Sequence, residues 1–113
     1  MEYTFGTIAD IPALIDMRTA YILEDFGKLS PEDEAIMRKT LPDYFSEHLN
    51  WDCIAFLAKD GETVVSVALL MILQKPCHPK MIHGKMGEVL SVYTLPAYRR
   101  RGIAQHNMQR LVD

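Results

Sequence analysis

The chain has 113 residues, of which 49% are hydrophobic and 24% charged, and its formal net charge is −3 with a pI of about 5.8. One domain over residues 1–113 fits this length, and the acidic balance argues against nucleic acid as the main partner, because nucleic-acid-binding proteins are usually basic. Two cysteines are too few for a disulfide scaffold, the chain does not begin with a signal pattern, and the longest apolar run, 67–73, is too short to span a membrane. We therefore expect a cytoplasmic protein that binds neither nucleic acid nor a membrane.

Residues 2–26 predict a strand followed by a helix. Polar and apolar side chains alternate weakly over residues 2–8, as they do in half-buried strands. Apolar side chains recur at helical spacing over residues 11–26. Asp10 can cap the start of this helix, and Gly27 can end it in a left-handed conformation.

A second helix is predicted after Ser30, which can cap its first turn ahead of Pro31. Pro42 has no backbone N–H and its ring crowds the preceding turn. We therefore expect the helix to break or kink there, with Thr40 capping a second piece over residues 41–49.

The second half of the chain predicts three strands and a helix. Two apolar runs within residues 53–74 flank Asp60 and Gly61, a pair that favours a tight hairpin turn. Residues 75–85 contain two prolines and a glycine and predict a loop, and residues 86–95 predict another strand. The order strand, two helices, three strands, helix indicates an α/β (α+β) fold, with a mixed, mostly antiparallel sheet and flanking helices.

The expected core includes aromatic residues before the second strand and apolar residues of the last helix. The aromatic residues are Tyr44, Phe45 and Trp51, and the last helix contributes Ile103, Met108 and Leu111. Cys53 opens a strand and is expected in the core as well.

The segment AYRRRGIAQHNMQRL, residues 97–111, follows a strand and begins a helix. The first turn of a helix offers unpaired N–H groups and the positive end of the helix dipole, which together favour phosphate. Gly102 lets a ligand approach the backbone, and Arg100 and Arg101 add positive charge. Two other interpretations of the arginine run are a nucleic-acid contact and a solvated loop.

The sequence VYTLPAYRRRGIA resembles the acetyl-CoA-binding segment of the GNAT acetyltransferase superfamily. The signature of that family is Gln or Arg, two residues, Gly, one residue, then Gly or Ala. Arg99, Gly102 and Ala104 fill this pattern, and the V-x-P pattern upstream is met loosely by 94–96, with Thr in place of Val. The order of the predicted elements also matches the N-terminal portion of the family.

The resemblance implies a GNAT-like acyl-CoA N-acyltransferase fold and acetyl-CoA as cosubstrate, without a metal. The implied activity is transfer of an acetyl group to an amine, which attacks the thioester directly. Backbone groups of the last strand would pair with the pantetheine arm, and N–H groups of the next turn would hold the pyrophosphate. The implied cofactor-binding residues are Val92, Tyr93, Thr94, Arg99, Arg100, Arg101, Gly102, Ile103, Ala104 and Gln105.

Other residues are weaker candidates for chemistry. Glu88 lies at the position of a catalytic glutamate in some family members and could act as a base through a water; the alternative is an ordinary solvent-facing glutamate. The set Cys77, His78 and His83 has no standard zinc spacing, so we expect ordinary loop residues there. In the family this loop lies near the acceptor, which makes contact with the substrate the alternative. In the family the first two helices and their loop form part of the acceptor site. Tyr21, Glu24 and Asp25 are therefore possible contacts for a cationic amine, although a solvated helix end is the stronger interpretation.

Compared with the family, the chain ends before the C-terminal strands and helix, and before the tyrosine that often acts as the acid. We therefore expect an incomplete domain over residues 1–113, whose last strand lacks a neighbour and favours a homodimer or larger assembly. The alternative to an active enzyme is a truncated CoA-binding or structural module without turnover. The sequence does not name the acceptor amine.

Overall fold

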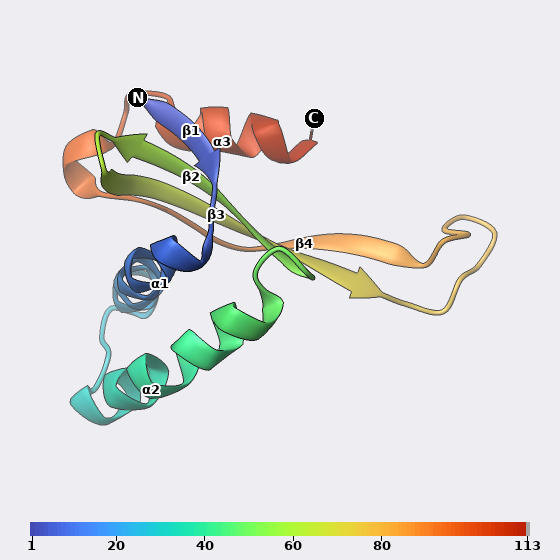
Figure 1. Ribbon diagram of the computed structural model, residues 1–113, viewed down its shortest axis with the longest axis horizontal. Coiled ribbons are helices and arrows are strands. Elements are labelled where there is room, and N and C mark those ends of the chain that lie inside the picture. The colour runs from blue at the N-terminus through green and yellow to red at the C-terminus, as the bar shows by residue number, and fades with distance from the viewer. Residues whose placement is uncertain (113) are drawn as a thin grey trace.

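The computed structural model describes residues 1–112 and is drawn in Figure 1. These residues form four strands, three α-helices and two short 3-10 helices. They are β1 (Glu2–Phe5), η1 (Ile8–Asp10), α1 (Ile11–Phe26), α2 (Pro31–His48), β2 (Cys53–Asp60), β3 (Thr63–Gln74), β4 (Lys85–Thr94), η2 (Pro96–Tyr98) and α3 (Ile103–Val112). This is the element order that the sequence predicts. Among the described residues, no helix is both long and apolar enough to cross a membrane.

The strands form one antiparallel sheet in the order β1-β2-β3-β4. Gly61, with a φ of +63°, makes the tight turn between β2 and β3, as the Asp-Gly pair predicts. Helices α1 and α2 lie on one face of the sheet and α3 lies on the other (Figure 1). Beyond the body of the sheet, β3 and β4 continue as a two-stranded arm that ends in the predicted loop (Figure 1).

The main core lies between the sheet and the pair α1 and α2. Phe45 of α2 and Cys53 of β2 are buried there, which confirms both as core residues, and Tyr44 packs against them while half-buried. A smaller cluster under α3 includes Ile103. The buried apolar residues of the main core are Ile11, Leu14, Ile15, Met17, Phe45, Cys53, Ala55, Leu57, Val64, Val67, Leu69 and Tyr93.

The predicted break in the second helix is wrong, because α2 continues through Pro42. Ser30 caps its start, accepting a hydrogen bond from the Asp33 backbone N–H at 3.1 Å, as predicted. Thr40 does not cap a new helix; its hydroxyl donates to the Ile36 carbonyl at 2.9 Å, within the same helix. The buried Phe45 anchors the second half of α2 on the core, and this packing outweighs the cost of an interior proline.

The start of α1 also differs from expectation. β1 ends at Phe5 rather than residue 8, and Asp10 makes no side-chain cap to α1. Its carboxylate instead accepts a hydrogen bond from the Thr7 backbone N–H at 2.8 Å and pairs with Lys59 Nζ at 2.9 Å. Asp10 therefore ties the short helix η1 to β2, and Gly27, with a φ of +79°, ends α1 as predicted.

Trp51 is not in the core, contrary to the sequence-based expectation. Its side chain is 78% exposed in the turn between α2 and β2. The Asp52 carbonyl accepts a hydrogen bond from the Ile72 N–H at 2.8 Å, which fixes the backbone of this turn beside β3. The ring lies outside the core because the turn runs along the edge of β3, beyond the layer that α2 covers.

Candidate functional site

β4 is an edge strand that carries a bulge and leads into the site. In the described part of the chain, β3 is its only strand neighbour. Leu69 pairs with Ser91 and Leu70 with Val89, so Leu90 is an extra residue in β4. The outer edge of such a strand presents N–H and C=O groups that can pair with an extended ligand.

The three strand residues that the resemblance assigns to the cofactor form the end of β4. Val92 is half-buried, whereas Tyr93 and Thr94 are buried. The hydroxyls of Thr94 and Ser66 lie 2.9 Å apart, and the Leu95 N–H donates to the Val65 carbonyl at 2.9 Å. These contacts set the direction in which the chain leaves the sheet.

The turn between β4 and α3 has an unusual backbone. Arg100 and Gly102 both have positive φ values, +64° and +75°, and Arg100 is thus a non-glycine residue in the left-handed region. The His106 N–H donates to the Gly102 carbonyl at 2.9 Å, which is the first helical bond of α3. The backbone N–H groups of 103–105 consequently have no partner within the helix and lie at its positive end.

Gly102 lies next to open space at the start of α3. A Cβ added to Gly102 would meet no atom within 4 Å. A side chain at this position would therefore extend away from the protein rather than against it. Glycine also satisfies the positive φ.

The three arginines of the turn have different surroundings. Arg101 lies over the Tyr98 ring at 5.1 Å, and the Tyr98 hydroxyl donates to Asp60 at 2.7 Å, a bond that raises the pKa of that tyrosine. Arg100 is exposed. Both lie at the turn, as the sequence predicts.

Arg99 is bound to the protein itself. Its Nε donates to the Thr94 carbonyl at 2.9 Å, and its two terminal nitrogens each lie 2.8 Å from an oxygen of Glu24. The guanidinium also lies over the Tyr93 ring at 5.3 Å. Of the arginines that the resemblance assigns to the cofactor, Arg99 is thus the one whose charge is already paired.

Glu88 lies well away from the turn. It is exposed on β4 and pairs in register with Met71 of β3. Directly opposed residues share a face of the sheet, and Met71 accepts a hydrogen bond from the Tyr44 hydroxyl, so Glu88 faces the α1 and α2 side. Thr94 lies six positions after Glu88, which is about 20 Å along an extended strand.

The histidines of the arm take part in local turns. Nδ1 of His78 accepts a hydrogen bond from the Lys80 N–H at 3.1 Å, and Nδ1 of His83 accepts one from the Lys85 N–H at 3.0 Å. Cys77 is exposed in the same loop. Over residues 1–112, no group of three His, Cys, Asp or Glu residues is arranged to hold a metal ion.

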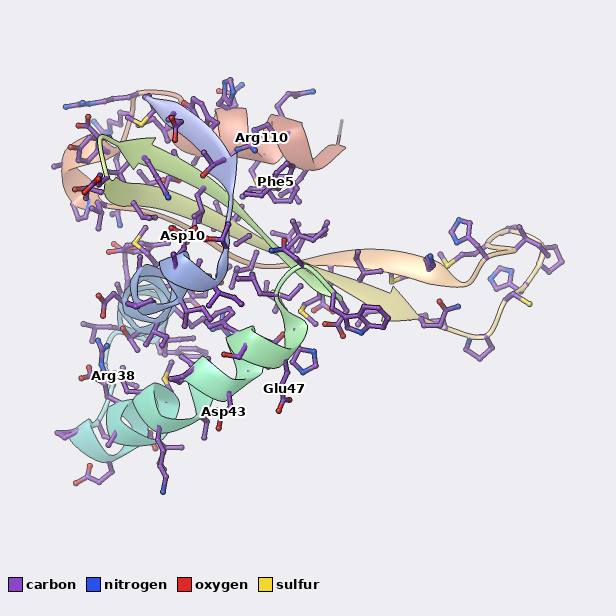
Figure 2. All side chains as sticks on the ribbon, in the orientation of Figure 1. Phe5, Asp10, Arg38, Asp43, Glu47 and Arg110 are labelled. Atoms are coloured by element: carbon purple, nitrogen blue, oxygen red, sulfur yellow. The ribbon has the colours of Figure 1, made fainter. Side chains whose placement is uncertain are left out.

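Asn107 is a buried polar residue that the sequence-based reasoning missed. Its side chain is 0% exposed under α3, where it donates to the Phe56 carbonyl at 3.3 Å and accepts from Arg110 at 3.1 Å. Arg110 in turn lies 5.1 Å from the Phe5 ring, and Figure 2 shows the two side chains next to each other. The available signal was the spacing, because Asn107 lies one helical turn after the buried Ile103. These contacts hold α3 on the sheet and so fix its free N–H groups at the turn.

Two hollows lie elsewhere on the surface. One, of about 520 Å³, is lined by Trp51, Asp52, Ile72, Leu73, Gln74 and Lys85. The other, of about 540 Å³, lies between the end of α1 and the start of α2 and is lined by Ile22, Phe26, Lys28, Leu29, Ser30 and Asp33. Neither hollow is lined by residues of the β4–α3 turn.

The turn therefore combines an extended strand edge with a helix start whose N–H groups have no helical partner, an arrangement suited to a long ligand with a phosphate group. The sequence profile of the Acetyltransferase (GNAT) family matches residues 16–113. Because this match spans most of the chain, the protein belongs to the GNAT family of acetyltransferases.

Solved structures support the same fold. A predicted acetyltransferase from Clostridium acetobutylicum, crystallised with acetyl-CoA, superposes with a TM-score of 0.83 at 27% identity, over 98% of this chain and 70% of that one. A GCN5-related N-acetyltransferase from Ralstonia eutropha gives a TM-score of 0.72 at 23% identity, over 96% and 71% of the two chains. A ribosomal-protein-alanine N-acetyltransferase from Brucella melitensis gives 0.67 at 18% identity, over 100% and 70%. No curated protein sequence matches the chain significantly. These similarities confirm the predicted α+β, GNAT-like fold.

Proposed function

We propose that the chain binds acetyl-CoA along the outer edge of β4 and at the β4–α3 turn, and that it transfers the acetyl group to an amine. The observation that carries this proposal is the turn itself, where the N–H groups of 103–105 have no backbone partner and Arg100 and Gly102 lie directly before them. Family membership and the acetyl-CoA in the Clostridium acetobutylicum structure support the choice of ligand.

The residues of the site fit the two ends of this cosubstrate. A pyrophosphate needs backbone donors and positive charge, which the start of α3 and Arg100 supply. An extended pantetheine arm needs a strand edge, which Val92, Tyr93 and Thr94 supply. The bulge at Leu90 interrupts the regular ladder between β3 and β4, and it lies between these three residues and Glu88.

The chemistry is direct attack by the amine nitrogen on the thioester carbonyl carbon. A C–N bond forms and the C–S bond breaks; the nitrogen loses a proton and the leaving thiolate gains one. Glu88 is the proposed base, because it faces the α1 and α2 side while remaining exposed, so that a water can carry the proton to it. Glu88 and the turn lie far apart along β4, as we expect for groups that act at the thioester end and at the pyrophosphate end of one extended ligand.

A second candidate function is CoA binding without turnover. The observation in its favour is that, among the described residues, no strand lies beyond the outer edge of β4 that could supply further groups for proton transfer. Binding and turnover are separable by experiment, since the first needs the turn and the second also needs the proton-transfer groups.

The test is a thiol-release assay with acetyl-CoA and a panel of small amines, peptide N-termini and lysine peptides. We expect at least one acceptor to release free CoA, and Glu88→Gln to lower kcat by about 100-fold or more with little change in the KM for acetyl-CoA. Glu47→Gln is the matched control, because Glu47 is exposed on α2 and Figure 2 shows it pointing away from the sheet. Full activity of Glu88→Gln would remove Glu88 from the mechanism, and binding without release in any reaction would favour the second function.

A further inference from the structure

We infer that Glu24, at the end of α1, is a positioning residue that holds the β4–α3 turn in its phosphate-binding shape by binding Arg99. This inference rests on the proposed function for its role in binding, but the ion pair itself is a feature of the free protein. Arg99 and Glu24 are 75 residues apart in the chain, so their contact joins two separate elements.

The geometry of the pair is specific. The two terminal nitrogens of Arg99 meet the two carboxylate oxygens of Glu24 at 2.8 Å each, which is a bidentate arrangement. The remaining nitrogen, Nε, donates to the Thr94 carbonyl at 2.9 Å, where β4 ends. The Tyr93 ring lies 5.3 Å from the guanidinium. One side chain therefore connects the end of α1, the end of β4 and the start of the turn.

The helix dipole gives a second reason for the pairing. Glu24 lies in the last turn of α1, and this turn contains no basic side chain. A carboxylate at this negative end of the dipole is unfavourable by itself. Arg99 supplies the missing positive charge from another element, so the contact relieves an unfavourable charge as well as forming a new bond.

Because Arg99 is already bound to Glu24, the arginines of the turn have different proposed roles. Arg99 is followed directly by Arg100, whose φ is +64°, and then by Gly102 at +75°. Gly102 adopts its positive φ without strain, but a left-handed non-glycine residue such as Arg100 persists only when the surroundings maintain it. We therefore assign anchoring to Arg99 and contact with phosphate to Arg100 and the backbone N–H groups.

An exposed ion pair usually contributes little to stability, and the side chains of Arg99 and Glu24 are 39% and 54% exposed. The expected effect is therefore local rather than global. It falls on the turn, where the amides of Leu95, Tyr98 and Arg99 donate hydrogen bonds to neighbouring carbonyls.

Hydrogen exchange on the free protein tests the anchor directly. In Glu24→Gln, the amides of Leu95, Tyr98 and Arg99 should exchange about fivefold faster than in the parent, whereas the core strands should be unchanged. Glu47→Gln, which removes the same charge from α2, should leave all of these rates unchanged. Equal exchange at the turn in the parent and in Glu24→Gln would overturn the inference.

A double-mutant cycle tests the effect on binding. By calorimetry, Glu24→Gln should weaken CoA binding by about fivefold in the parent and have no effect in an Arg99→Gln background. An equal effect in both backgrounds would show that Glu24 acts by another route. If the parent binds CoA and Glu24→Gln binds it equally well, the inference fails while the proposed function stands; if the parent does not bind CoA, the proposed function fails and the exchange rates alone decide the anchor.

Discussion

Asp10 makes the junction between α1 and the sheet sensitive to acid. Burial alone would raise the pKa of its carboxyl, but the hydrogen bonds from Lys59 and Thr7, with the positive charge of Lys59, outweigh burial and lower the pKa below its usual 3.8. Because the folded pKa is the lower one, the carboxylate stabilises the fold at pH values above about 4. This contribution is lost as the pH falls through the folded pKa.

We expect Asp10→Asn to be less stable than the parent at pH 7, since Lys59 then loses its charged partner. The stability difference should shrink below pH 3.8, the usual value, as the parent carboxylate takes up a proton. Urea unfolding of both proteins at pH 7 and at several acid pH values measures this. A difference that stays constant down to the lowest pH would show that the charge of Asp10 is not the cause.

At the scale of elements, the helix α2 is the clearest case of packing that overrides a local signal. Pro42 lies inside this helix, removes one backbone hydrogen bond and is about 3 kcal/mol less favourable than Ala in a helix interior. Phe45, one turn later, is buried, and Leu41 and Tyr44 pack against the same core.

Pro42→Ala should therefore raise the free energy of unfolding by about 1–3 kcal/mol, because it restores the missing N–H while keeping the packed residues in place. Urea denaturation with an unchanged m-value is the measurement. A loss of stability would mean instead that contacts of the proline ring contribute more to the packing of α2 than the restored N–H does.

Local sequence signals predicted the elements well wherever a single residue determines the backbone conformation at a helix end or a turn. Gly27 and Gly61 lie at positive φ values where a helix ends and a hairpin turns, and Ser30 caps α2. The same signals failed for Asp10 and Trp51, because their surroundings depend on contacts with Lys59 and on the edge of β3. Such long-range contacts have no local pattern.

In the candidate site, too, local features could be predicted from the sequence and long-range contacts could not. The motif located the turn, the glycine and the start of α3, because a phosphate site of this type is formed by residues that are adjacent in the sequence. It did not show that Arg99 binds Glu24, because that partner is 75 residues distant and is chosen by the packing of α1 beside β4. Nor did it show Asn107, whose burial follows from the seating of α3 on the sheet.

For the whole molecule, we expect the outer edge of β4 to govern association between chains. Val89 on this strand is exposed, and β4 has no second strand neighbour in the described residues. Unpaired edges and exposed apolar side chains favour pairing between chains. We predict a homodimer or larger assembly at micromolar concentration, measured by sedimentation or light scattering, and weaker association in Val89→Lys. A monomeric mass for the parent would contradict this prediction.

The most direct test of the central claim is a calorimetric titration with acetyl-CoA of the parent, Gly102→Glu and Gly61→Glu. Gly61 is a matched control, because its φ is also positive, at +63°, and an added Cβ there also meets nothing within 4 Å. We predict that the parent and Gly61→Glu bind and that Gly102→Glu does not, since glutamate would place bulk and negative charge against the pyrophosphate. Binding by Gly102→Glu equal to that of the parent, or no binding by the parent, would contradict the assignment of this turn as the acetyl-CoA site.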